Sequence, residues 1–482
     1  MRRFAVAFAM LAFLAGTRAS ADPFENLSQR LEQYDQQVQS RARSGSRSSA
    51  PVQQAQAQMR PAAQSRPPAR MRRPARMASM QSAPQQAAPM VEEVQPVPMM
   101  DPGYQEYYPG DMWEEPMGCA SGYCGGGGDC GWFPPGFFGR AEYIAFWVRG
   151  ANTPPLVTTS PPGTPVGSAG VLPNAEILFG DERINTAGRS GGRFTLGYWF
   201  DPCESLAIEN SFFFLGNGDE SYAASSSGSP ILARPLFNVD TDAQDALLLA
   251  YPEIVVGSVN VTSSRTVYSN DLRLRRALYA DCCRRVDILA GYRYFRIAEG
   301  LDIRTNTTTI AGGEVPVGTN SAVEDLFNTR NNFNGGELGV NWQMTRGCWT
   351  FDVFAAVALG GVSQRVRING STVVQAPGED PLTYEGGILA LDSNIGQYDR
   401  TVFGVLPELQ LNLRYQWTPL WRLNFGYTFM ALTNVVRPGD QIDLQVDPNQ
   451  FPPGTSGTFP QFAFNNSDIW VQGINFGIET NF

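Results

Sequence analysis

The sequence predicts an all-β fold, an antiparallel transmembrane β-barrel of ten strands, with twelve strands as the alternative. Three observations predict it. Between residues 137 and 482, apolar and polar residues alternate over stretches of about ten residues or more. The connections between these stretches are either very short or very long. The chain also begins with an export signal.

Residues 1–21 have the composition of a secretory signal peptide. Arg2 and Arg3 form the basic start, and residues 4–16 form an apolar stretch too short to cross a bilayer as a helix. Ala19-Ser20-Ala21 offers small residues for cleavage, so Asp22 is the expected first residue of the mature chain. This pattern favours the general secretory route.

Two zones precede the alternating region. Residues 22–40 carry a heptad-spaced apolar repeat, which predicts a short helix. The helix either forms a small coiled coil that assembles a homo-oligomer, or packs on another surface or frays. Residues 41–136 are rich in Pro, Gln, Arg and Met and predict a linker that forms no core. Its arginine-rich part either contacts peptidoglycan or another envelope polymer, or is a soluble spacer.

Alternation is clearest in three C-terminal stretches, 397–415, 421–429 and 474–482. Each has one apolar face, typified by Leu409, Phe425 and Phe476, and one polar face. Pro407 lies on the apolar face of the first stretch, where it has no N–H to donate to a sheet. The last stretch ends in Phe482 and has the pattern of a terminal barrel strand.

The connections fall into two classes. Short turns are expected near residues 201–204, 281–284, 345–348 and 416–420. Long polar connections are expected near 150–190, 217–265, 298–331, 362–396 and 437–466. Short turns at one end and long loops at the other are typical of outer-membrane barrels. With ten strands, both termini lie on the short-turn side; an extra hairpin near 301–309 gives the alternative of twelve.

Charged residues lie on the face opposite the apolar one, so we expect them to line the lumen. They are Asp271, Arg273, Arg275, Arg293, Glu337, Arg400, Glu408, Arg414 and Arg422. One interpretation is a salt-bridged lumen that fills the barrel, because buried charges must be paired. The other is an arginine-lined constriction that selects small anions.

The seven cysteines are candidates for disulfides because the chain is exported. They are Cys119, Cys124, Cys130, Cys203, Cys282, Cys283 and Cys348. Four of them fall in predicted short turns, so the hypothesis is that bridges fix the 119–130 segment beneath the barrel. The count is odd, so one thiol is free or pairs between chains.

Composition excludes several functions. The chain contains no His and no Lys, which removes histidine bases and ligands and lysine nucleophiles. We therefore expect no enzyme, no cofactor and no metal site. A net charge of −10 argues against nucleic acid as a partner.

Short motifs are dispersed through residues 138–482. They include Ile177-Leu178-Phe179-Gly180, Gly197-Tyr198-Trp199, Gly291-Tyr292-Arg293-Tyr294, Ser393-Asn394-Ile395-Gly396, Leu406-Pro407-Glu408 and Arg437-Pro438-Gly439-Asp440. With them the region resembles the outer-membrane β-barrel family expanded in planctomycetes, which is similar to Legionella-type pore-forming outer-membrane proteins. The resemblance implies a pore-forming barrel without catalytic residues.

Two functions follow as expectations. The first is a narrow, passive outer-membrane pore governed by size and lumen charge. The alternative is a structural or adhesive envelope protein with a plugged barrel and a periplasmic tether. Outer-membrane lipid and the barrel-assembly machinery are the expected partners in both.

Deleting Phe482 should impair membrane assembly and leave export intact, because the terminal aromatic residue belongs to the predicted assembly signal. The measurement is the amount of heat-modifiable barrel in outer-membrane fractions, beside the amount of signal-cleaved chain. Wild-type levels of folded barrel in the deletion variant would contradict this role.

Overall fold

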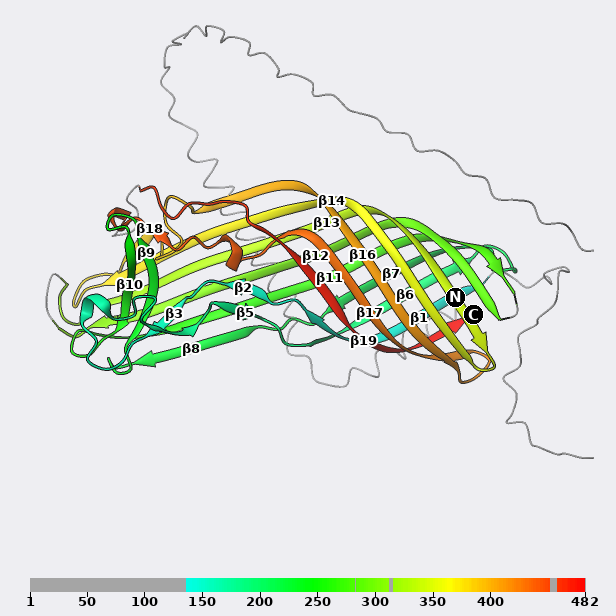
Figure 1. The fold of residues 1–482 in the computed structure, drawn as a ribbon, viewed down its shortest axis with the longest axis horizontal. Helices are drawn as coiled ribbons and strands as arrows, with labels where there is room; N and C mark the ends of the chain where they lie inside the picture. Colours follow the sequence, from blue (N-terminus) through cyan, green and yellow to red (C-terminus); the bar gives the residue numbers. More distant parts are fainter. Residues whose placement is uncertain (1–135, 282, 312–314, 451–456, 482) are drawn as a thin grey trace, which may run out of the picture. The chain divides into compact units, whose positions relative to one another are not determined.

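A closed ring of ten antiparallel strands is the main element of the computed structural model, which describes residues 136–281, 283–311, 315–450 and 457–481. In ring order the strands are β1 (Phe137–Val148), β6 (Arg189–Trp199), β7 (Leu206–Leu215), β11 (Val255–Ala280), β12 (Arg284–Thr309), β13 (Asn320–Arg346), β14 (Trp349–Gln375), β16 (Gly396–Gln416), β17 (Trp421–Val436) and β19 (Asn466–Asn481). Each pairs with the next, and β19 pairs with β1 (Figure 1). The predicted all-β barrel and its count of ten are confirmed.

Four short turns join neighbouring strands at one end of the barrel, as predicted. They occupy residues 200–205, 281–283, 347–348 and 417–420. The first is held by Asp201, whose carboxylate accepts the backbone N–H groups of Ser205 and Leu206. Partial burial acts to raise the pKa of Asp201, but these hydrogen bonds hold it below its ordinary value.

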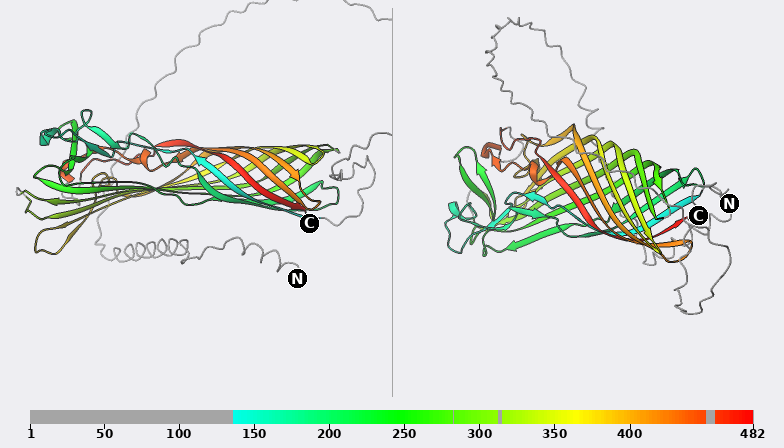
Figure 2. Two further views of the ribbon diagram at one scale, coloured as in Figure 1. Left: turned by 90° about the horizontal axis from the view of Figure 1, so that it is seen from below. Right: turned by 45° about the vertical axis from the view of Figure 1, so that its right-hand side comes forward.

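The long connections at the other end are partly strand. β11 to β14 are 26 or 27 residues long, whereas β1, β6 and β7 have 10 to 12. A membrane-spanning strand needs about 9–11 residues, so these four strands extend well past β1, β6 and β7 (Figure 2). β16 has 21 residues and accompanies β14 as far as Ile368. Residues 255–265, 298–309, 320–331 and 362–375, predicted as loops, belong to this extension. Residues 301–309 pair with β11 and β13, so they form no extra hairpin.

Small elements from the long connections form a cap at this end. They are β2 (Ala151–Thr153), β3 (Val157–Thr159), η1 (Val166–Ser168), β4 (Glu176–Phe179), β5 (Glu182–Ile184), β8 (Glu220–Ser226), β9 (Leu232–Asn238), β10 (Ala243–Ala250), β15 (Leu382–Glu385), η2 (Gly439–Gln441), β18 (Gln445–Val446) and η3 (Pro448–Gln450). β8 and β15 pair with the extended strands β11 and β14. The cap packs on the extension through an apolar cluster that includes Leu156, Leu232, Phe327 and Leu391. None of the described helices is long and apolar enough to cross a membrane.

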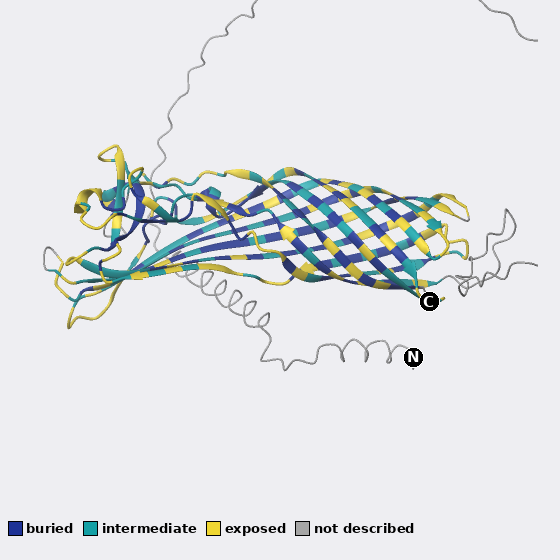
Figure 3. Cartoon of the chain, turned by 60° about the horizontal axis from the view of Figure 1, so that its bottom comes forward, coloured by how far each residue is buried: buried dark blue, intermediate teal, exposed yellow. Residues whose placement is uncertain are grey.

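Burial in the barrel is inverted relative to a soluble protein. Outward positions such as Phe403, Leu338 and Phe425 are large, apolar and exposed, whereas inward positions are buried and often charged. The alternation gives the checkered wall of Figure 3. It follows from the two-residue period of a strand, which places neighbours on opposite faces. The outward face therefore forms an apolar band around the ring.

Pro407 leaves the register between β14 and β16 unbroken, because it pairs with Val357 there. On its other side, the ladder between β16 and β17 stops at Glu408. Side chains replace the lost backbone bonds: Thr433 accepts the N–H of Val405, and Asn434 donates to the carbonyl of Phe403.

Replacing Leu338 by Arg should lower the free energy of unfolding in lipid vesicles by about 2–4 kcal/mol, because the side chain lies in the apolar band. Urea titration of the refolded protein measures this. The matched control is Leu326→Arg, on the outward face of the same strand but in the extension, where Asp302 is its cross-strand neighbour. An equal loss at both positions would argue against lipid contact at Leu338.

Candidate functional site: a filled lumen

Inward side chains fill the ring in three layers. On β12 the layers follow one another along the strand from the short-turn end. Asp287 and Arg293 belong to a charged layer, Phe295 and Ile297 to an apolar layer, and Glu299 to a second charged layer beneath the cap. All five side chains are buried. The interior is therefore largely filled by its own side chains.

Two arginines and three carboxylates form the centre of the first charged layer. Arg293 lies with Nε 3.0 Å from Asp271 and Nη1 3.3 Å from Glu337. Arg273 lies 2.7 Å from Glu337 and 3.2 Å from Asp271. Glu408 pairs with Arg293 and lies 3.8 Å from Arg273. Each carboxylate thus contacts both guanidinium groups, which the planar, forked arginine side chain permits.

Some of these contacts bridge the lumen rather than neighbouring strands. Arg193 on β6 donates to Gln410 on β16 at 3.3 Å and to Thr428 on β17 at 3.0 Å. Arg273 on β11 reaches Glu408 on β16. Both of these pairs of strands, β6 with β16 and β11 with β16, are four places apart in the ring of ten. Side chains from almost opposite walls therefore meet in the interior.

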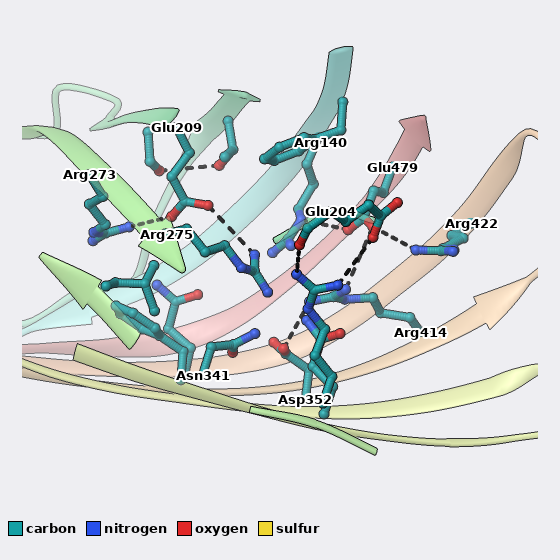
Figure 4. A pocket seen from close by; sticks show the side chains of 18 of the residues that line it. Arg140, Glu204, Glu209, Arg273, Arg275, Asn341, Asp352, Arg414, Arg422 and Glu479 are labelled. Carbon is teal, nitrogen blue, oxygen red and sulfur yellow. Dashed lines mark hydrogen bonds and ion pairs between the residues drawn. The ribbon is translucent and has the colours of Figure 1, made fainter. Parts of the chain in front are cut away.

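Glu479 forms ion pairs with three arginines at the short-turn mouth (Figure 4). It lies 3.0 Å from Arg140, 3.3 Å from Arg422 and 3.6 Å from Arg414. Arg414 in turn lies 2.9 Å from Asp352. Arg140 and Glu479 stand directly opposite each other on β1 and β19. The ion pair therefore lies on the seam where the first and last strands close the ring.

A cavity of ≈ 100 Å³ lies in this charged layer. The charged residues that line it are Arg140, Arg193, Glu204, Glu209, Arg273, Arg275, Arg285, Asp352, Arg414, Arg422 and Glu479. It has room for a few water molecules, each of which needs roughly 10–15 Å³ measured in this way.

The apolar layer lies directly above. The rings of Phe146, Phe213 and Phe295 form a chain with centroids 6.1 and 6.3 Å apart. They come from β1, β7 and β12, and Phe333 of β13 and Met430 of β17 join the same cluster. Because these residues are at most 3% exposed, the layer separates the short-turn mouth from the cap by close contact.

Above this layer, Glu299 of β12 binds two arginines. Its carboxylate lies 2.7 Å from Arg265 of β11 and 2.8 Å from Arg437, the first residue after β17. Arg437 also donates to the carbonyl oxygens of Arg149 and Gly150. One buried carboxylate thereby fixes the starts of two long connections to the wall.

A second buried carboxylate, Asp325 of β13, holds the cap. One oxygen accepts the backbone N–H groups of Ile388, Leu389 and Ala390, and the other lies 2.6 Å from Arg234 of β9. Gly387 makes this possible, since a Cβ there would lie 2.1 Å from the carboxylate. Two long connections are thus bound to the same side chain.

Comparison with known proteins agrees with this architecture. The family described as Putative beta barrel porin-7 (BBP7) matches residues 138–482, which include almost the whole ring and its cap. The chain belongs to the BBP7 family. It is therefore an outer-membrane β-barrel of porin-like type.

No curated protein matches the chain. Among solved structures, it is similar to the outer membrane protease OmpT from Escherichia coli, with 9% identity, 73% of this chain and 100% of that chain covered, and a TM-score of 0.36. A FadL homologue of Pseudomonas aeruginosa has 6% identity, 72% and 90% coverage and a TM-score of 0.20. The Pseudomonas putida toluene transporter TodX has 8% identity, with 72% of this chain and 90% of that chain covered, and a TM-score of 0.15. At these scores, none of the three carries an argument about this BBP7 barrel.

The structure places all nine predicted charges on the inward face of the BBP7 barrel. Asp271, Arg273, Arg275, Arg293, Glu337, Glu408 and Arg414 are buried in the first charged layer. Arg422 stands at the short-turn mouth beside Glu479. Arg400 lies apart from them near the cap, where it donates to Gln364 and Asn466 and covers the ring of Phe464 at 4.0 Å.

Sequence reasoning missed about as many residues as it found. Glu142, Arg193, Glu209, Asp287 and Asp352 lie on inward faces and could have been found by extending the alternation rule to every strand. Arg234 and Arg437 lie in long connections, where no periodic pattern exists. Among the described residues, no group of three or more His, Cys, Asp or Glu could hold a metal ion.

The cysteine hypothesis stays a prediction. Cys119, Cys124, Cys130 and Cys282 lie outside the described residues, as do the signal peptide, the heptad helix, residues 41–135 of the linker, and Phe482. Cys283 is exposed and free, so it leaves the set of candidate bridge residues. Cys203 and Cys348 are not free, and their pairing is a matter for mass mapping.

Replacing Arg293 by Met should lower the free energy of unfolding by about 3–5 kcal/mol, because it leaves buried carboxylates short of a partner. Adding Glu408→Met should recover part of the loss, since it removes one of those carboxylates. Urea unfolding in vesicles measures both. Arg304→Met is the control, because Arg304 is exposed; a similar loss there would contradict the reasoning from burial.

Proposed function

We propose that this BBP7 barrel is a closed, structural protein of the outer membrane, which anchors and displays the extension and its cap. The observation that carries the proposal is the set of side-chain contacts across the lumen, from Arg193 to Gln410 and from Arg273 to Glu408. A passive pore needs a continuous wet passage. Here the charged layer is neutralised by its own pairs, and the apolar layer above it is fully buried.

The proposal includes the placement of the chain in the envelope. Residues 1–21 direct export by the general secretory route, and the termini and short turns face the periplasm. The cap and the extension then lie outside the cell, where long loops are normally found. Barrel-assembly machinery inserts the chain, and residues 41–136 tether it to peptidoglycan or another envelope polymer. The heptad helix of residues 22–40 favours a homo-oligomer.

The proposal assigns no catalytic activity, in line with the lack of His and Lys. The resemblance to the planctomycete barrels and to the Legionella-type proteins supports the same membrane location.

A narrow passive pore is the second candidate. The family description favours it, and so does the cavity at the short-turn mouth, which seven arginines and four carboxylates line. Each of these arginines has a carboxylate partner, but seven guanidinium groups facing the cavity would favour small anions if the apolar layer moved aside.

Planar-bilayer recording of the full mature chain tests the two candidates. We expect no stepwise conductance from the wild-type protein. The triple variant Phe213→Ala, Phe295→Ala, Phe333→Ala should conduct, because it removes the rings of the apolar layer. Heat-modifiable migration of both proteins is the folding control. Regular steps from the folded wild-type chain would overturn the closed barrel and favour the pore.

A further inference from the structure

Three arginines lie on the outward face of the barrel, at the long-loop edge of the apolar band. They are Arg296 on β12, Arg330 on β13 and Arg365 on β14. Their outward direction follows from alternation, since Tyr292, Leu338 and Leu359 on the same faces are 50–67% exposed. We call these three residues the arginine patch.

The distance along each strand places the patch above the band. On β13, the outward residues from Met344 to Gly336 are apolar or Gly, Asn334 and Asn332 follow, and then comes Arg330. The outward residues of β12 run from Val286 to Tyr294 before Arg296. An apolar band about 25 Å tall corresponds to roughly ten residues of a tilted strand. The patch therefore lies at the level of lipid headgroups.

The patch has more positive charge than its surroundings neutralise. Arg330 and Arg365 stand directly opposite each other, and Arg296 is the diagonal neighbour of Arg330. Like charges directly opposite each other destabilise a sheet. Within the part of the chain that the structure describes, Asp399, 2.6 Å from Arg365, is the one carboxylate that forms an ion pair with the patch. Three arginines and one aspartate leave a net charge of +2.

Arg296 and Arg330 form no ion pair with a carboxylate of any described residue. Arg296 covers the ring of Tyr268 at 5.6 Å and donates Nη1 to its hydroxyl group, so no carboxylate among the residues that the structure describes neutralises its charge. Arg330 makes no ion pair or hydrogen bond within the described part of the chain. Guanidinium groups bind phosphate oxygens with two parallel hydrogen bonds.

We propose that the arginine patch binds a phosphorylated lipid headgroup of the outer leaflet, with its acyl chains lying on Leu338, Leu359 and Tyr292. Charge and position both favour a lipid over free phosphate, because the patch adjoins the exposed apolar band. The proposal depends on the outward orientation of the long-loop end. It does not depend on whether the lumen is closed. A conductance that contradicts the closed barrel would therefore leave lipid binding untouched, and a failed lipid titration would leave the closed barrel untouched.

The test is titration of the full mature chain, purified in neutral detergent, with bisphosphorylated lipid A. The readout is the temperature at which the heat-modifiable form converts. We expect a saturable rise with lipid A, and none with phosphatidylcholine or with inorganic phosphate at the same concentration. For the double variant Arg330→Gln, Arg365→Gln, half-saturation should need about thirtyfold more lipid A, since each arginine near an anionic surface contributes about fivefold in affinity.

A second readout separates binding from a merely structural role. Without lipid A, the double variant should be about as stable as the wild-type chain, because removal of the like-charge pair offsets the loss of the exposed Arg365–Asp399 ion pair. Arg304→Gln is the matched control, an outward arginine of the extension that already pairs with Asp302 and Glu324, and its half-saturation should equal that of the wild-type protein. Unchanged half-saturation in the double variant, or an equal rise with inorganic phosphate, would overturn the proposal.

Discussion

The closed ladder of backbone hydrogen bonds is the constraint on which the rest of the structure depends. In lipid, every strand must be paired on both sides, so the tenth strand has to meet the first. Once β19 pairs with β1, the two-residue period of each strand divides its residues into an outward-facing and an inward-facing set. The outer set must be apolar, and the inner set must fill a lumen little wider than its own side chains.

Filling that lumen with charge requires a particular side chain. Buried carboxylates such as Glu337, Glu408 and Glu479 each contact two or more cations, so each cation must also serve several carboxylates. Arginine can do so because its five donors lie in a rigid plane, whereas lysine presents a single compact charge. The absence of lysine from the whole sequence is thus consistent with an interior built of shared, rather than paired, charges.

The sequence predicts those parts of the barrel in which apolar and polar residues alternate with the two-residue period of a strand. Faces of β16, β17 and β19 and all four short turns follow from alternation and turn residues. The extension was missed because its strands are polar on the outward face; residues 304–309 of β12 are mostly Thr and Asn, and Thr pairs well in a sheet. The Arg234–Asp325 contact could not be predicted, because it joins a long connection to a strand 91 residues away.

The layered interior also limits how such a barrel could ever open. Breaking one buried pair by displacing a single partner costs about 3–5 kcal/mol, which lowers the population of the broken state roughly a hundred- to several-thousandfold. An open lumen would have to lose the contacts of Arg193 and Arg273 together and also part the phenylalanine layer. In the closed barrel that we propose, thermal fluctuation alone therefore leaves the passage closed. A conducting state becomes accessible only if arginines exchange carboxylates without ever leaving one unpaired. The clustering of Asp271, Glu337 and Glu408 around Arg293 provides the partners for such an exchange.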